Sequence, residues 1–101
     1  MITFKNSGSL TNSPTTMVTT GGIYSRLVKN IIVTNLDTIS HIIHLEVGVT
    51  LTKVNLFAGD SLHFNSTTAL GADDLVGYVE EVVVGTGPTY VVSYLVENET
   101  V

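Results

Sequence analysis

Cysteine, tryptophan and glutamine are absent from this 101-residue sequence, and alanine occurs only three times. Without cysteine there is no disulfide framework, no thiolate zinc ligand and no thiolate nucleophile, so packing and hydrogen bonds must hold the fold together. The scarcity of alanine and glutamine removes good helix formers. Val and Thr, in contrast, occur 15 times each and Ile seven times. Because β-branched residues favour strands, we expect an all-β protein.

Positive charge is also scarce, since four Lys and Arg residues stand against nine Asp and Glu, a net charge of −5. This is the wrong sign for a surface that binds nucleic acid or anionic lipid. No stretch approaches 18 consecutive apolar residues, and the first residues lack the basic and apolar regions of a signal peptide. We therefore expect a protein made in the cytoplasm that binds neither nucleic acid nor membrane.

The length suits one domain. Apolar segments separated by turn residues predict about eight strands, as in a single antiparallel β-sandwich of jelly-roll type. The polar start predicts a short strand and an extended N-terminal arm over residues 1–14, ahead of a sandwich domain over 15–101. The predicted strands are 2–5, 16–20, 24–35, 41–49, 52–57, 61–64, 75–84 and 89–97, the last two joined as a hairpin through 85–88.

The alternation of apolar residues breaks within the strand predicted over 24–35. Ile31 and Val33 share one face with Lys29, while Val28 and Ile32 lie on the other. Either a β-bulge resets the register or both faces of this strand are partly covered.

Three neighbouring residues resemble the components of a catalytic triad, namely Asp60, Ser61 and His63. On a strand, Ser61 and His63 share one face about 6–7 Å apart and Asp60 points to the other, so they cannot hydrogen-bond in series. No nucleophile-elbow motif surrounds Ser61. We interpret Asp60 as a turn former and expect no catalytic residue.

Metal sites are equally weakly indicated. His41 and His44 are an odd number of residues apart and so face opposite sides of a strand, while His44 and Glu46 share an outer face that we expect to be solvated. The turn sequence at 57–62 is echoed at 70–75, which suggests that Asp60 and the pair Asp73-Asp74 converge at one end of the sandwich. Such turn carboxylates could bind calcium, but no calcium-loop motif is present. We expect no metal and no cofactor.

Apolar residues occupy both faces of the last predicted strand. Tyr90 and Tyr94 belong to one face and Val91 to the other, so one face lies on the core and the second needs a cover. A neighbouring subunit or the N-terminal arm of the protein itself would serve. We expect Tyr90, Tyr94 and, from the arm, Ile2 and Phe4 to contact a partner.

The order of several segments resembles the small β-sandwich structural proteins of tailed bacteriophages. The segments that carry the resemblance are Ser9–Asn12, Gly21-Gly22, Leu27–Asn35, Phe57–Leu62 and Gly71–Leu75. The resemblance implies a component of the virion that acts as repeated copies, often trimers.

On this basis we expect a virion structural protein, not an enzyme. The first choice is a capsid decoration (cement) protein on the outer capsid surface, which contacts the major capsid protein and stabilises the head by bridging its subunits. A second possibility is a neck or tail accessory protein or a fibre base. The alternative from another class is a carbohydrate- or receptor-binding sandwich, in which the turns at Asp60 and Asp73 would hold sugar hydroxyls.

Overall fold

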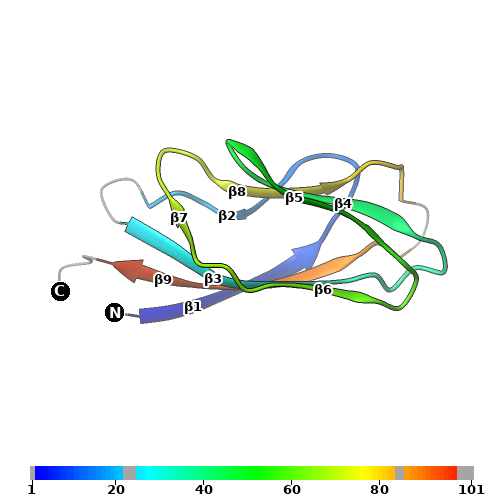
Figure 1. Ribbon diagram of the computed structural model, residues 1–101, viewed down its shortest axis with the longest axis horizontal. Coiled ribbons are helices and arrows are strands. Elements are labelled where there is room, and N and C mark those ends of the chain that lie inside the picture. Colours follow the sequence, from blue (N-terminus) through cyan, green and yellow to red (C-terminus); the bar gives the residue numbers. More distant parts are fainter. Residues whose placement is uncertain (1, 22–24, 84–85, 98–101) are drawn as a thin grey trace.

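A computed structural model describes residues 2–21, 25–83 and 86–97, and these contain nine strands and no helix. Three residues of the predicted elements lie outside the described residues: Gly22 and Gly85 of predicted turns, and Tyr24, the first residue of the strand predicted over 24–35. One sheet contains five strands and the other four, and they stack face to face (Figure 1). The all-β prediction is confirmed. The strands are β1 (Ile2–Ser9), β2 (Thr15–Val18), β3 (Ser25–Thr34), β4 (His41–Val47), β5 (Val49–Leu56), β6 (Ser61–Phe64), β7 (Thr68–Leu70), β8 (Leu75–Val79) and β9 (Thr89–Glu97).

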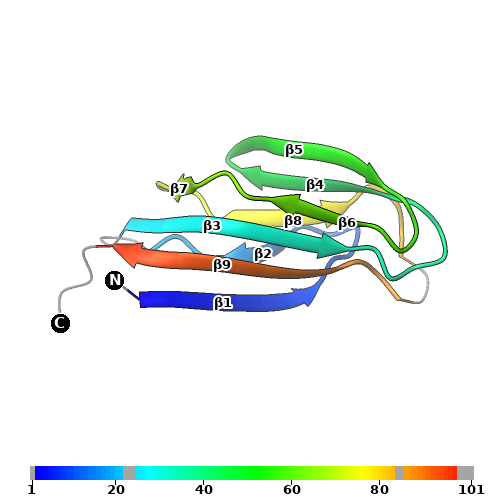
Figure 2. The ribbon, with the colours of Figure 1, turned by 60° about the horizontal axis from the view of Figure 1, so that its bottom comes forward.

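The pairing pattern is that of a long antiparallel hairpin that has been rolled up. The first four strands pair in turn with the second half of the chain: β1 with β9, β2 with β8, β3 with β6 and β7, and β4 with β5. Rolling adds the pairs β3–β9 and β4–β8 and gives the sheet orders β1-β9-β3-β6 and β2-β8-β4-β5 (Figure 2). This is the jelly-roll arrangement of two sheets. The prediction that the last two strands form a hairpin is wrong, because β8 and β9 belong to different sheets.

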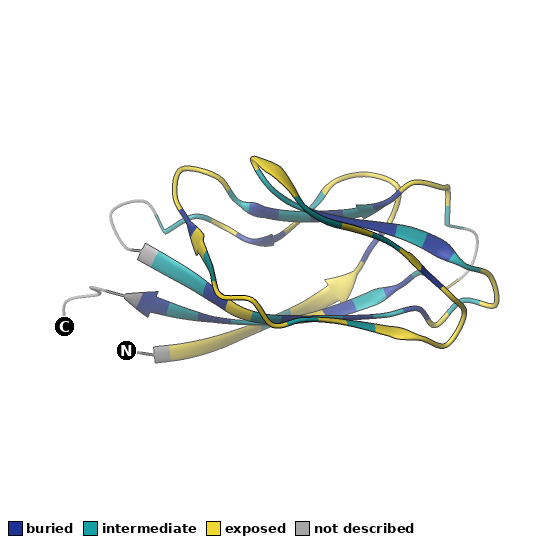
Figure 3. Cartoon of the chain, viewed as in Figure 1, coloured by how far each residue is buried: buried dark blue, intermediate teal, exposed yellow. Residues whose placement is uncertain are grey.

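The core lies between the sheets and is built from alternate residues of each strand (Figure 3). On β3, Val28, Ile31 and Val33 are all fully buried although their spacing is not regular. A register shift between Val28 and Asn30 explains this, because Lys29 is the extra residue of a bulge against β9. Of the two alternatives that the sequence left open for this strand, the structure shows the bulge and places it at Lys29.

The strand predicted over 2–5 is longer in the structure, because residues 6–9, expected to begin the extended arm, continue β1 as an edge strand of the larger sheet. β1 pairs with β9 along its whole length, from Ile2 opposite Val96 to Ser9 opposite Thr89. Leu10 then enters the core, where it is fully buried, and its backbone N–H donates to the carbonyl of Pro88. The sandwich therefore begins with the first strand, and the boundary expected near residue 14 does not separate two units.

Tyr90 and Tyr94 face the core and are 7% and 8% exposed, so the face assignment made for β9 is corrected. The opposite face carries Val91, which is 42% exposed. The sequence could not decide between these faces because both are apolar. Phe4 lies directly opposite Tyr94 and stacks on it, with ring centroids 5.4 Å apart, yet remains 37% exposed. For Ile2 the structure describes the backbone, which pairs with Val96.

Candidate functional site: the loop end of the sandwich

Three chain connections meet at one end of the sandwich and expose large apolar side chains there. They join β3 to β4 (residues 35–40), β5 to β6 (57–60) and β8 to β9 (80–88, described except at 84–85). We define the loop-end surface as the apolar residues of these connections together with their carboxylates. The apolar members are Leu36 (56% exposed), Ile39 (56%), Phe57 (60%) and Val82 (66%), and the acidic members are Asp37, Asp60, Glu80 and Glu81.

Backbone hydrogen bonds join the first two connections into one unit. The N–H of Asn35 donates to the carbonyl of Asp60 at 2.9 Å, and the N–H of Gly59 donates to the carbonyl of Asn35 at 2.8 Å. Gly59 has a φ of 81°, a left-handed conformation that glycine adopts without steric cost. The turns that display Leu36 and Phe57 are thus fixed relative to each other.

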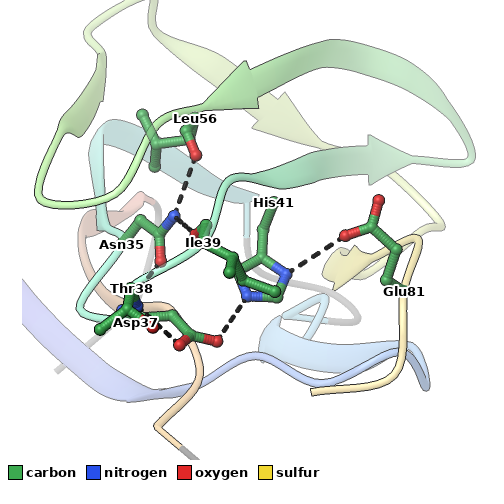
Figure 4. Close-up of polar contacts among 7 residues, drawn as sticks. All are labelled: Asn35, Asp37, Thr38, Ile39, His41, Leu56 and Glu81. Carbon is green, nitrogen blue, oxygen red and sulfur yellow. Dashed lines mark hydrogen bonds and ion pairs between the residues drawn. The ribbon is translucent and has the colours of Figure 1, made fainter. Parts of the chain in front are cut away.

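The side chain of Asn35 fixes these turns from the inside (Figure 4). It is completely buried, and its Nδ2 donates to the carbonyls of Ile39 at 2.8 Å and Leu56 at 2.9 Å. Its Oδ1 accepts from the N–H of Asp37 at 3.0 Å. A buried amide with its groups satisfied in this way specifies one loop conformation, because any other leaves polar groups unpaired.

His41 joins the third connection to the first. Its ring is fully buried, and Nε2 lies 2.8 Å from Oδ2 of Asp37 (Figure 4). Nδ1 lies 3.6 Å from Oε2 of Glu81, which is too long for a hydrogen bond and is an ion pair only when the imidazole is protonated. The hydrogen bond from His41, followed by that from the Thr38 N–H, holds the pKa of the Asp37 carboxyl below its usual value.

The loop-end surface combines apolar side chains with negative charge. Residues 35–40, 57–60 and 80–88 include four carboxylates and no Lys or Arg. One of them, Glu80, is paired with Lys53 of β5 at 3.2 Å. An apolar surface with one sign of charge favours a partner that is apolar and basic.

A second polar cluster lies on the outer face of the smaller sheet and corrects the expectation that His44 is solvated. The His44 ring is only 9% exposed and stacks on Tyr78, with centroids 4.5 Å apart and planes at 4°. Its Nε2 lies 2.7 Å from Oε1 of Glu80, and this contact, then that with Lys53, lowers the pKa of Glu80. Burial, then the charge of Glu46, raises the pKa of Tyr78, whose hydroxyl donates to Glu46 Oε2 at 3.4 Å.

The triad-like residues of the sequence are engaged elsewhere. The hydroxyls of Ser61 and Thr34 lie 2.9 Å apart, as cross-strand neighbours on β6 and β3. His63 lies opposite Ile32 on the same pair of strands and is exposed. Asp60 contributes its backbone carbonyl to the turn. In the described part of the chain these side chains form no hydrogen-bonded series.

The acidic turns do not converge, contrary to expectation. Ser61, next to Asp60, pairs with the end of β3 at Thr34, whereas Leu70, which precedes the Asp73-Asp74 turn, pairs with the start of β3 at Arg26. The two turns therefore lie at opposite ends of the sandwich. Asp74 is used structurally, because its Oδ1 accepts from the N–H of Thr20 at 2.7 Å. Among the described residues, no three His, Asp or Glu side chains are grouped as metal ligands.

The sequence did not identify the loop-end surface, although it contained a signal. Leu36 and Ile39 stand among Asn, Asp, Thr and Ser in a segment predicted as a turn. Large apolar residues in such a turn either reach the core or are exposed for a partner.

No protein-family model matches the sequence, and no curated protein matches it significantly. The described residues include no helix that is long and apolar enough to cross a membrane.

Proposed function

We propose that this chain is a non-enzymatic virion structural protein of a tailed bacteriophage, a capsid decoration protein that binds the outside of the head. Attachment to the major capsid protein occurs through the loop-end surface, and bridging of capsid subunits stabilises the shell. The proposal unites the sequence resemblance with a jelly-roll fold, an architecture that also builds viral capsid domains. Fold likeness alone does not define function, so the argument depends on the surface.

The observation that carries the proposal is the set of four apolar side chains exposed on connections that are held in place from within. Burying such a side chain in an interface contributes about 1.5–3 kcal/mol, before the cost of association is subtracted. Because the turns are already ordered by Asn35 and His41, little additional entropy is lost when a partner binds. Repeated copies on one particle then add their modest affinities.

The carbohydrate-binding alternative receives no comparable support. It assigned sugar hydroxyls to the turns at Asp60 and Asp73, and these turns lie at opposite ends of the protein, so they do not form one site together. A neck or tail accessory role would use the same loop-end surface, and differs only in which virion protein it meets.

The test is co-sedimentation with heads of the encoding phage that lack this protein. We expect the wild-type chain to sediment with the heads and the double variant Leu36→Ser, Phe57→Ser to remain in the supernatant. Both positions are more than half exposed, so the variant should keep its fold, which circular dichroism verifies. The matched control is Val49→Ser, which removes a 71% exposed apolar side chain outside the loop end and should leave binding unchanged.

Any of three results would overturn the proposal. A wild-type chain that does not sediment with heads excludes the decoration role. Sedimentation with tails or necks alone would move the role to those structures, and equal binding by wild type and double variant would show that the attachment surface lies elsewhere.

A further inference from the structure

The two sheets have four edges within the described residues, and three of these edges carry features that discourage pairing with another chain. β2 is four residues long and has a register shift between Thr16 and Val18. β6 and β7 are four and three residues long and are separated by a break. The pairing of β5 with β4 contains a register shift, and β5 exposes Lys53. Short length, bulges and lysine are the usual protection of sheet edges.

The fourth edge, formed by β1, has none of these features apart from a single charge. It is eight residues long, pairs with β9 without a register shift, and contains no proline. Lys5 is its only charged residue. A long, regular and nearly uncharged edge is a template for a further strand.

The backbone groups that face outward from β1 can be identified. Leu10 lies opposite Pro88 in the same register, and its N–H donates to the Pro88 carbonyl. Hydrogen-bonded and non-hydrogen-bonded pairs alternate along an antiparallel ladder, so the even-numbered residues of β1 bond to β9. The N–H and C=O groups of the odd-numbered residues therefore point to the open edge, and they belong to Thr3, Lys5, Ser7 and Ser9.

We propose that a second copy of this chain occupies this edge, with the two β1 strands antiparallel about a two-fold axis at Asn6. In this register Thr3 lies opposite Ser9 of the other copy and Lys5 opposite Ser7, so every outward-facing backbone group from 3 to 9 finds a partner. The two five-stranded sheets then become one continuous sheet. This proposal concerns a surface other than the loop end and does not depend on the proposed function.

Side chains favour this register over the neighbouring one centred on Lys5. A two-fold axis at Lys5 would place the two lysines directly opposite each other, which is unfavourable. With the axis at Asn6, the exposed Phe4 ring lies opposite Gly8 of the other copy. Tyr90 covers that glycine, because a Cβ at Gly8 would meet the Tyr90 hydroxyl at 2.9 Å. Phe4 would thus pack beside the Tyr90 ring of the other copy and lose its remaining exposure.

The symmetry has a geometric consequence. β1 runs from the opposite end of the sandwich toward the loop end, so antiparallel pairing directs the two loop ends in opposite directions along the long axis (Figures 1 and 2). The closed assembly that this edge supports is a dimer, in place of the trimer that the sequence resemblance suggested.

The absence of native cysteine allows a direct test of the register. In the proposed pair Asn6 faces its own counterpart in a non-hydrogen-bonded position, where the Cα atoms approach within the range a disulfide bridges. Asn6→Cys should therefore form a covalent dimer under mild oxidation. Lys5→Cys and Ser7→Cys are the matched controls, since neither residue faces its own counterpart, and each should crosslink at least ten times more slowly.

A second pair of variants tests the edge without altering the β1–β9 ladder. Ser7→Pro removes an outward N–H, whereas Ser7→Ala retains it. We expect sedimentation velocity to show a concentration-dependent dimer for wild type and Ser7→Ala and a folded monomer for Ser7→Pro. Added salt should favour the dimer by screening the net negative charge of the two copies. The proposal fails if wild type and Ser7→Pro sediment alike, or if Asn6→Cys crosslinks no faster than the controls.

Discussion

Asp37 is ionised where its charge ties the connection between β3 and β4 to the first residue of β4, His41. Its carboxylate accepts from His41 Nε2 and from the N–H of Thr38, and these hydrogen bonds explain its lowered pKa. Hydrogen bonds from His44 and then Lys53 lower the pKa of the Glu80 carboxyl in the same way. Both carboxylates are therefore more acidic in the folded chain than in the unfolded one, which binds protons first as the pH falls.

The folded state should consequently lose stability in acid. This contribution is fully present above the usual carboxyl pKa, about pH 4, and is lost as the pH falls through the lowered values of the folded chain. Urea unfolding from pH 7 down to pH 3 should show a falling free energy of unfolding for wild type and a shallower decline for Asp37→Asn. Asp60→Asn is the control, because the Asp60 carboxylate forms no ion pair among the described residues. Equal slopes for Asp37→Asn and wild type would contradict the assigned role.

Strand β8 has a glycine at a position where the neighbouring side chains leave no room for a Cβ. Gly77 lies in the middle of β8, and a Cβ there would meet Met17 Sδ at 2.7 Å, Leu10 Cδ2 at 3.2 Å and Leu45 Cδ2 at 3.3 Å. All three neighbours are essentially inaccessible to solvent. The methyl group has no free space, so the core must shift to admit it.

Gly77→Ala should therefore destabilise the fold by about 1–3 kcal/mol, the usual cost of overpacking a core. Gly71→Ala is the matched control, because a Cβ at Gly71 meets nothing within 4 Å, and it should change stability by less than about 0.5 kcal/mol. Chemical denaturation of the three proteins measures the difference. Unchanged stability of Gly77→Ala would mean that Met17 moves aside without cost.

Local patterns predicted the strands well, but they did not predict which strands meet. The break in alternation along 24–35 allowed either a bulge or partial cover of both faces, and only the pairing with β9 shows that a bulge lies at Lys29. The turn residues at 85–88 suggested a hairpin, whereas β8 and β9 lie in different sheets. Which sheet a strand joins depends on partners that are distant in the sequence, and a local turn pattern does not contain that information. Both faces of β9 are apolar, so only the packed structure shows that Tyr94 faces inward.

The candidate site was harder to predict than the fold for the same reason. The segments that form the loop-end surface are separated in sequence and meet only when the hairpin rolls up. The position of His41 between Asp37 and Glu81 also depends on the folded arrangement of these connections, because Glu81 lies 40 residues after His41 in the sequence. The sequence contained the apolar residues of the turns but not their common location.

The whole protein combines two surfaces whose roles can be separated. The loop-end surface is proposed to attach to a particle, and the β1 edge to join two copies with their loop ends facing in opposite directions. A dimer of this kind has two attachment points, so it can bind two capsid subunits at once and make the second contact effectively intramolecular. Bridging requires both surfaces, whereas attachment requires only one.

Variants of the two surfaces should therefore fail in different ways. Ser7→Pro, which retains the loop end, should still bind heads but with an affinity reduced by roughly 10²-fold or more, because avidity is lost. It should not raise the temperature at which heads release their DNA, whereas wild type and Ser7→Ala should. Leu36→Ser, Phe57→Ser should dimerise normally and bind no heads. If Ser7→Pro stabilises heads as well as wild type does, bridging occurs within one copy and the dimer is not the cementing unit.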